Sequence, residues 1–398
     1  KMRFLALQNI EIAPPDGEEF GIIDAEFIIF DGILAKCEVQ ASRVGNAIRG
    51  ITWRRIINLD AFKSAPGTTS TETDGKVTWA LHGNSTSGFY ATGADGLLIE
   101  KVLCDHAGWA DGYAYDCRAD FPHPPSMYSQ GMYLQYSIND LTVRDVIVTR
   151  ASSIAIQQRS GGITERVLMV GNNGGLLTAG QIGDEDGNFS YVSDLWVTQG
   201  GMKATEKEAS LYLAGGVDVG TPLTTLDAVV VAHRGAMPPP GEFGPCGPAW
   251  RTYGSSWPIL NLGTNGSTYE GPQFVGYDWG GRENILPEGA DTSRMAGATL
   301  AAWLDTRLGA AGHEAHDLYP FLRGLAAPWA EIKGILDWAL PRYGFARGDR
   351  TAATTVRFAP VADGRTPGMR ADIRRDWSTG DLPGTVAGDS VDLDGHRV

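Results

Sequence analysis

Residues 131–172 read GMYLQYSINDLTVRDVIVTRASSIAIQQRSGGITERVLMVGN, and this stretch decides the fold. Within it, the apolar unit DVIV at 145–148 returns as RVLM at 166–169. Each unit is preceded by a segment in which apolar and polar side chains alternate, GMYLQY from residue 131 and SIAIQQ from residue 153. Alternation with a period of two is typical of a strand with one buried face. The stretch therefore predicts two consecutive turns of a repeating β structure.

The same repeat extends over the first half of the chain. Its anchor positions are Ile10, Ile33, Ile56, Val102, Val146, Val167, Leu195 and Val229. The steps between them are 23, 23, 46, 44, 21, 28 and 34 residues, and we interpret the steps of 46 and 44 as double steps, the first with Trp79 at its midpoint. A single short strand cannot bury its inward face, whereas a stack of about 22-residue coils forms a continuous interior. We therefore predict a parallel β-solenoid. The alternative is a β-sandwich with accidental spacing, but turn pairs such as NG or DG rarely fall at hairpin intervals.

Composition excludes several classes of protein. The 33 Lys and Arg residues face 47 Asp and Glu residues, and the resulting net charge of -14 disfavours binding to nucleic acid. No apolar run approaches the ~20 residues that span a bilayer, so no membrane insertion is predicted. The 52 glycines among 398 residues are typical of many tight turns between short extended segments rather than of a mainly helical fold.

Metal sites and a dense disulfide framework are not predicted. The four cysteines are Cys37, Cys104, Cys117 and Cys246, and no two of them form a CxxC pair. A bridge between Cys104 and Cys117 across a loop is left open. The run at 184–188 is similar to a calcium loop, but its Gly is out of place and the distal Glu is absent. No cofactor is predicted.

The chain changes character after the repeat. Residues 1–236 are predicted to form the β-solenoid, and residues 237–294, rich in Pro, Gly and aromatic residues, an irregular capping region. Apolar residues at three- and four-residue intervals predict a small helical module over 295–345, with its aromatic stripe as its own core. Residues 346–398 are expected to hold a linker and the start of a further β module. We expect the natural polypeptide to continue beyond both ends of this sequence.

Three segments carry a resemblance to a known family: DHAGW at 105–109, the repeat from residue 131, and GGLLTAG at 174–180. They resemble the right-handed parallel β-helix, pectate-lyase-like superfamily, over about residues 1–235. Members of this superfamily include polysaccharide lyases, glycosidases and the spike proteins of tailed phages and phage-like particles. The resemblance implies an all-β, right-handed parallel β-helix with polysaccharide as its partner. It also implies a homotrimer, contacts with virion or particle proteins, and a place on a virion surface or outside the cell.

One face of the predicted coils has the composition of a carbohydrate-binding surface. If Phe89, Ala91, Met132, Leu134, Ile154, Ile156, Leu211 and Leu213 point inward, the outward positions are Tyr90, Thr92, Tyr133, Gln135, Ala155, Gln157 and Tyr212. Tyrosine rings offer flat apolar area to sugar rings, and amide groups donate to and accept from hydroxyls. The 105–130 insertion, which includes Trp109, is expected to form a wall beside this face.

A catalytic role is the alternative interpretation. The candidate catalytic residues are His106, Asp111, Asp116 and Arg159. A glycosidase needs two carboxylates, and Asp105, Asp111, Asp116 and Asp120 are near enough in sequence to supply a pair. A lyase needs a base and a cation, roles open to His106, Tyr133 and Arg159. Against catalysis, the outward face lacks the acidic side chains that hold calcium. Similar proteins also often carry a histidine where this chain has Gln130 or Gly131.

We therefore expect a polysaccharide-binding spike or fibre protein that recognises a cell-surface glycan. A secreted polysaccharide lyase or glycoside hydrolase acting on an acidic polysaccharide is the alternative. A purely structural element is the third possibility. The setting on a phage or phage-like particle rests on the resemblance alone.

Overall fold

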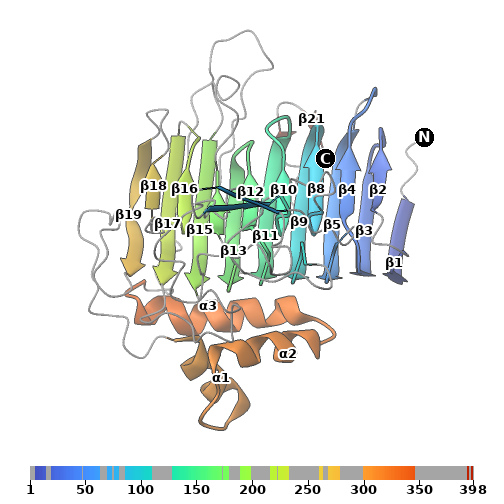
Figure 1. The fold of residues 1–398 in the computed structure, drawn as a ribbon. Coiled ribbons are helices and arrows are strands. Elements are labelled where there is room, and N and C mark those ends of the chain that lie inside the picture. Colours follow the sequence, from blue (N-terminus) through green and yellow to red (C-terminus); the bar gives the residue numbers. More distant parts are fainter. Residues whose placement is uncertain are drawn as a thin grey trace. The chain divides into compact units, whose positions relative to one another are not determined.

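The structure is a computed structural model in which two units are described separately, Lys1–Tyr343 and Gly344–Val398 (Figure 1). The described residues are 5–14, 19–46, 48–62, 70–73, 76–79, 86–109, 128–172, 174–178, 189–198, 216–221, 223–232, 260–262, 268–277, 299–345, 392–393 and 396–397. Asp111, Asp116, Asp120, Tyr212, Cys117 and the run at 184–188 that is similar to a calcium loop lie outside them. Most of the predicted capping region at 237–294 and of the predicted module at 346–398 also lies outside them.

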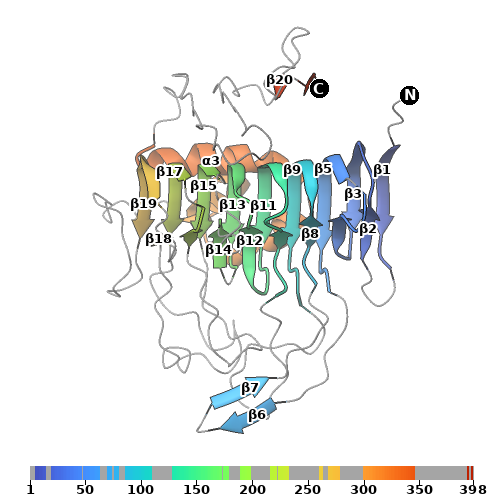
Figure 2. The same ribbon diagram turned by 90° about the horizontal axis from the view of Figure 1, so that it is seen from above.

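Parallel strands in two sheets form the body of the first unit. Within the described residues, one sheet has the order β1 (Leu5–Ile12), β3 (Ile28–Ala35), β5 (Ile48–Leu59), β9 (Ala94–Asp105), β11 (Asn139–Thr149), β13 (Gly162–Val170), β15 (Phe189–Thr198), β17 (Leu223–Ala232) and β19 (Thr268–Tyr277). The other has the order β18 (Leu260–Leu262), β16 (Val217–Val219), β14 (Gly174–Leu177), β12 (Ile154–Gln158), β10 (Met132–Leu134), β8 (Phe89–Thr92), β4 (Val39–Ser42) and β2 (Phe20–Ile23). The chain passes alternately from a short strand to a long one, so each strand stacks on its equivalent in the next coil (Figures 1 and 2).

The stacking confirms the predicted parallel repeat and excludes the sandwich. The anchor residues pair directly: Ile10 with Ile33, Ile56 with Val102, Val102 with Val146, Val146 with Val167, Val167 with Leu195, and Leu195 with Val229. All of these strand pairs are parallel, which is compatible with a parallel β-helix. Strands β18 and β19 extend the two sheets beyond residue 236, where the sequence predicts the solenoid to end.

The interpretation of two steps as double was wrong. Strand β5 pairs directly with β9, and β9 with β11, so no further coil lies between them. The stretch around Trp79 instead forms an antiparallel hairpin, β6 (Ser70–Thr73) with β7 (Lys76–Trp79). Alternating residues are typical of any half-buried strand, so the pattern alone does not distinguish a hairpin in an insertion from a coil of the stack. A second short antiparallel pair, β20 (Asp392–Leu393) and β21 (His396–Arg397), belongs to the other unit.

The interior between the two sheets is apolar. Phe89, Met132, Leu134 and Ile156 belong to one buried cluster, as the alternation predicts. Ala155 was predicted to point outward but is fully buried in the same cluster, and Ile154 packs with Leu177 in a separate one. These two residues begin strand β12 directly after a turn, where strict alternation does not yet apply.

The long strands from β3 to β17 each contain a bend that has no counterpart in the sequence prediction. Equivalent residues of successive coils adopt left-handed backbone angles, with φ between 51° and 70°, namely Gly32, Arg55, Lys101, Asp145, Arg166, Asp194 and Ala228. A residue with a Cβ atom loses roughly 1–2 kcal/mol in this conformation, so surrounding contacts must hold it. Some of these contacts are ionic, since Arg166 Nε lies 2.6 Å from Asp145 Oδ1 in the adjacent coil.

A row of alternating charge precedes the bend. Its members in successive coils are Asp31, Arg54, Glu100, Arg144 and Glu165. Arg144 Nη2 lies 2.6 Å from Glu100 Oε2, and both side chains are buried. Burial and the nearby carboxylate of Asp194 raise the pKa of Glu165 to about 7, although Arg166 opposes the shift. Opposite charges thus compensate each other along the stack, where isolated buried charges would be costly.

Three helices cover the outer side of the long strands, as the spacing over 295–345 predicts. They are α1 (Leu300–Leu308), α2 (Leu318–Arg323) and α3 (Glu331–Arg342), separated by the single turns η4 (Ala315–Asp317) and η5 (Pro328–Ala330). Thr299 Oγ1 accepts from Ala302 N at the start of α1, and Gly309 ends this helix with φ of 70°. In Figure 2, α3 runs along the long strands on the side away from the short ones.

An outward apolar row on the long strands explains why the helices dock there. The row is Leu103, Ile147, Leu168, Trp196 and Val230, paired in register and buried. Helix α3 contacts β11, β13 and β15, and the ring of Tyr343 lies 6.0 Å from that of Trp196. The aromatic residues of the module are therefore only partly its own core: Trp303 packs on Phe321 within the module, whereas Tyr343 packs on the sheet.

Replacing Leu168 by Ala should lower the free energy of unfolding by about 2–5 kcal/mol, because the change leaves a cavity between the sheet and the helices. Urea unfolding followed by circular dichroism measures the effect. Leu308→Ala is the matched control, since Leu308 is 42% exposed, and it should change stability by about 0.5 kcal/mol or less. Equal changes in the free energy of unfolding for the two substitutions would show that the helices do not pack on this apolar row.

Candidate functional site

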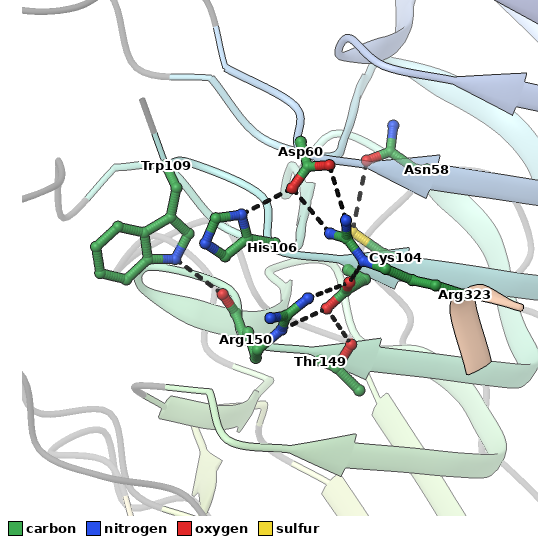
Figure 3. A network of polar contacts seen from close by, with 9 residues as sticks. Asn58, Asp60, Cys104, His106, Trp109, Thr149, Arg150 and Arg323 are labelled. Atoms are coloured by element: carbon green, nitrogen blue, oxygen red, sulfur yellow. Dashed lines mark hydrogen bonds and ion pairs between the residues drawn. The ribbon is translucent and has the colours of Figure 1, made fainter. Parts of the chain in front are cut away.

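The structure places the described candidate residues in two separate groups. One group lies on the outer face of the short-strand sheet and includes Tyr90, Tyr133, Gln135, Gln157 and Arg159. The other lies where the long strands end and includes His106 and Trp109 (Figure 3). Hydrogen bonds and ring contacts in the described part of the chain connect residues within each group, and none of those found joins His106 to Tyr133 or Arg159.

The first group is built on a row that we name the Tyr–Gln ladder: Gln40, Tyr90, Tyr133 and Gln157. Gln40 pairs with Tyr90, Tyr90 with Tyr133, and Tyr133 with Gln157, each in the adjacent coil. All four side chains are half-buried, so each one packs against its neighbours and keeps an exposed part. The rings of Tyr90 and Tyr133 lie 5.7 Å apart in an edge-to-face arrangement. The ladder is thus an ordered surface rather than a set of independent side chains.

Arg159 completes this surface at the end of strand β12. Its Nη1 donates to Tyr133 Oη at 3.0 Å and to Gln135 Oε1 at 3.1 Å. Its guanidinium carbon lies 5.3 Å from the centre of the Tyr136 ring. The sequence named Arg159 as a catalytic candidate beside His106, but the structure brings it together with Tyr133 and Gln135.

Further hydrogen bonds fix the amide groups of the ladder. Gln130 Nε2 donates to Gln157 Oε1 at 3.0 Å, and Ser87 Oγ bonds to Gln130 Oε1 at 3.3 Å. The hydroxyls of Thr92 and Ser137 lie 3.1 Å apart at the rim. The bond from Gln130 thus orients the amide group of Gln157.

The second group forms around a row of left-handed residues that end the long strands. These are Asp60, His106, Arg150 and Gly171, with φ between 51° and 67°. His106 Nδ1 lies 2.8 Å from Asp60 Oδ1, and the imidazole stacks on the indole of Trp109 with 5.5 Å between centroids (Figure 3). Trp109 Nε1 in turn donates to the carbonyl oxygen of Arg150 at 2.9 Å.

Arg323 connects helix α2 to this group. Its guanidinium contacts Asp60 at 2.8 Å and 3.1 Å and also donates to Asp105. Asp105 is 1% exposed and accepts further bonds from Arg150 at 2.5 Å and 2.9 Å and from Thr149 at 2.6 Å. We name Asp60, Asp105, His106, Arg150 and Arg323 the corner network (Figure 3).

Contacts within the corner network stabilise the ionised forms of Asp60 and Arg323. Burial raises the pKa of Asp60, but the hydrogen bonds with His106 and Arg323 outweigh it and hold this pKa well below its usual range. Burial lowers the pKa of Arg323, yet its contacts with Asp60 and Asp105 raise that pKa above its ordinary value. Asp60 therefore does not supply the protonated carboxyl that a glycosidase needs.

The cysteine nearest the site is a free thiol. Cys104 is fully buried, its Sγ lies 3.8 Å from Asn58 Oδ1, and burial raises the pKa of this thiol. Cys104 therefore does not form the disulfide bridge to Cys117 that the sequence left open. The reason is orientation, because Cys104 points into the interior of the coils with the core cluster.

Sequence reasoning missed Asp60, Arg150 and Arg323. Asp60 and Arg150 occupy the position equivalent to His106 in neighbouring coils, so a coil alignment offers a signal for them. Arg323 lies 263 residues from Asp60 and gives no such signal.

Comparisons with protein-family models, with curated proteins and with solved structures find no match for this chain. The described residues contain no cluster of three or more His, Cys, Asp or Glu side chains arranged to hold a metal ion. Nor is any described helix both long enough and apolar enough to cross a membrane.

Arg323→Ala should lower the free energy of unfolding by about 3 kcal/mol, because it removes a charged partner from buried Asp105. Thermal or urea unfolding provides the measurement. Arg307→Ala, which removes an ion pair whose arginine is 47% exposed, is the control and should cost about 1 kcal/mol or less. If Arg323→Ala lowers the free energy of unfolding no more than Arg307→Ala does, the corner network does not stabilise the docking of the helices on the strands.

Proposed function

We propose that this chain is a polysaccharide-binding protein that holds a glycan on the Tyr–Gln ladder, on a right-handed parallel β-helix. One observation carries the proposal: Tyr90, Tyr133 and Gln157 pair in register on one partly exposed face. A sugar polymer presents a flat apolar face and a series of hydroxyls. Rings and amides repeated at a strand spacing of about 4.8 Å suit such an extended ligand.

The ladder residues are also held in place before any ligand arrives. Gln157 accepts from Gln130, and Tyr133 accepts from Arg159. A side chain that is already ordered loses less conformational entropy on binding. The helices pack on the long strands, on the side away from the short ones, so they do not cover the ladder (Figure 2).

Binding without cleavage is the version that we favour. Asp105 accepts hydrogen bonds from Thr149 and Arg150 and is almost inaccessible, so it does not meet a substrate. Asp111 and Asp116 remain sequence predictions because they lie outside the described residues. By resemblance, we place the protein as a homotrimeric spike or fibre on a virion, a phage-like particle or another extracellular surface.

A polysaccharide lyase or glycoside hydrolase is the second candidate, and one observation favours it. The Nδ1 atom of His106 is 2.8 Å from Asp60, and a carboxylate in this position orients an imidazole so that Nε2 can act as a base. His106 is also partly exposed beside Trp109. New reducing ends or an unsaturated, ultraviolet-absorbing product after incubation with a polysaccharide would establish this activity in place of simple binding.

Tyr133→Ala should weaken retention on a glycan array about tenfold or more, equal to about 1.4 kcal/mol, because it removes the central ring and a partner of Arg159. Surface plasmon resonance with the polysaccharide identified on the array measures the affinity. Trp338→Ala is the control, because Trp338 is an aromatic residue of helix α3, away from the ladder. Unchanged binding by the Tyr133 variant would contradict the proposal.

A further inference from the structure

Arg159 differs from most other arginines of the described chain in its partners. Arginines paired with a carboxylate are Arg49, Arg54, Arg55, Arg144, Arg150, Arg166, Arg307 and Arg323. Arg159 instead contacts a phenol, an amide and an aromatic ring, all of them neutral. Within the described residues no carboxylate lies within 4.0 Å of its guanidinium. Among the residues that the structure describes, nothing at the Tyr–Gln ladder therefore compensates its positive charge.

The geometry of Arg159 also suits an incoming anion. Hydrogen bonds within the described residues involve only Nη1 of its guanidinium, which leaves Nη2 and Nε available to donate. A guanidinium offers paired N–H groups in a plane that match the two oxygens of a carboxylate or a sulfate. Because Tyr133 and Gln135 already hold the side chain, Arg159 loses little conformational entropy when it binds an anion.

A second uncompensated arginine lies on the same rim. Arg43 follows strand β4, is exposed and has no carboxylate within 4.0 Å among the described residues. Its stem lies against Gly93, where a Cβ atom would come within 2.6 Å of Arg43 Cβ and where φ is 68°. Only glycine allows this close approach without strain. The backbone N–H of Arg43 donates to the carbonyl of Thr92, which places it next to the ladder.

The two arginines stand at opposite ends of the ladder. Along the short-strand sheet the order is β12, β10, β8, β4, so Arg159 and Arg43 are three strand spacings apart. At about 4.8 Å per spacing, their backbones are roughly 14 Å from each other. Tyr133 and Tyr90 lie on the two strands between them.

From these observations we infer that the ladder binds an anionic polysaccharide, with Arg159 and Arg43 each receiving a carboxylate or sulfate group of the polymer. The inference rests on the proposed function and specifies its ligand. A chain of net charge -14 repels polyanions, so a local pair of uncompensated cations is what allows such a ligand to bind. A polymer that runs across strands β12 to β4 can present one acidic group to each arginine.

Four immobilised polymers test the inference: alginate, carboxyl-reduced alginate, dextran sulfate and unmodified dextran. Alginate or dextran sulfate should bind at least tenfold more tightly than its neutral counterpart, and the tighter of the two identifies carboxylate or sulfate as the recognised group. Arg159→Gln and Arg43→Gln should each weaken binding about tenfold, whereas Arg342→Gln, on helix α3, should not. Raising salt from about 50 to about 500 mM should weaken binding in the wild-type protein more than in the double variant.

The outcomes separate this inference from the proposed function. If a neutral polymer binds as tightly as its anionic counterpart, and Tyr133→Ala but neither arginine variant weakens binding, the ladder binds glycans and the anionic ligand is wrong. If none of the polymers binds, or if Tyr133→Ala binds like the wild type, both are overturned. Unchanged thermal unfolding of the arginine variants shows that lost affinity does not come from lost folding.

Discussion

Backbone hydrogen bonding between successive parallel coils is the constraint on which the rest of the structure depends. Once Val146 pairs with Val102 and Val167, every other residue of that coil must lie beside its equivalent in the next one. A slip of one residue would turn each side chain to the opposite face. Rows of equivalent residues are the result, and the character of each row determines what that face of the molecule can do.

Three outer rows illustrate this division of roles. The alternating charges from Asp31 to Glu165 compensate one another along the stack. The apolar row that includes Leu168 and Trp196 is buried under the helices, and Arg323 ties those helices to the ends of the long strands. The Tyr–Gln ladder is the row that remains half-exposed, with a cation held beside it by neutral groups. Stability and ligand binding are therefore assigned to different faces of the same coils.

The repeat and the ladder could be predicted from the sequence because both follow from a period of two within each strand and from an apolar unit that recurs once in every coil, whatever the length of the intervening loops. The anchors and the outward positions of Tyr133 and Gln157 agree with the structure for this reason. The hairpin near Trp79 could not be recognised, since its alternation is that of any strand. The sequence also gives no indication of the bends in the long strands, because Arg55, Lys101 and Ala228 are not residues that favour left-handed backbone angles. The partnership of Arg323 with Asp60 depends on how the helices dock, which no local pattern encodes.

The most direct test of this account is whether distant residues of the chain are neighbours on one face. A variant with Tyr133→Cys and Gln157→Cys places two thiols on paired positions about 4.8 Å apart, within reach of a disulfide. A variant with Tyr90→Cys and Gln157→Cys places them about 10 Å apart, beyond reach. Mass spectrometry after mild oxidation should find an intramolecular bridge in the first variant and none in the second. A bridge in the second variant only, or in neither, would contradict the stacking of coils in this register.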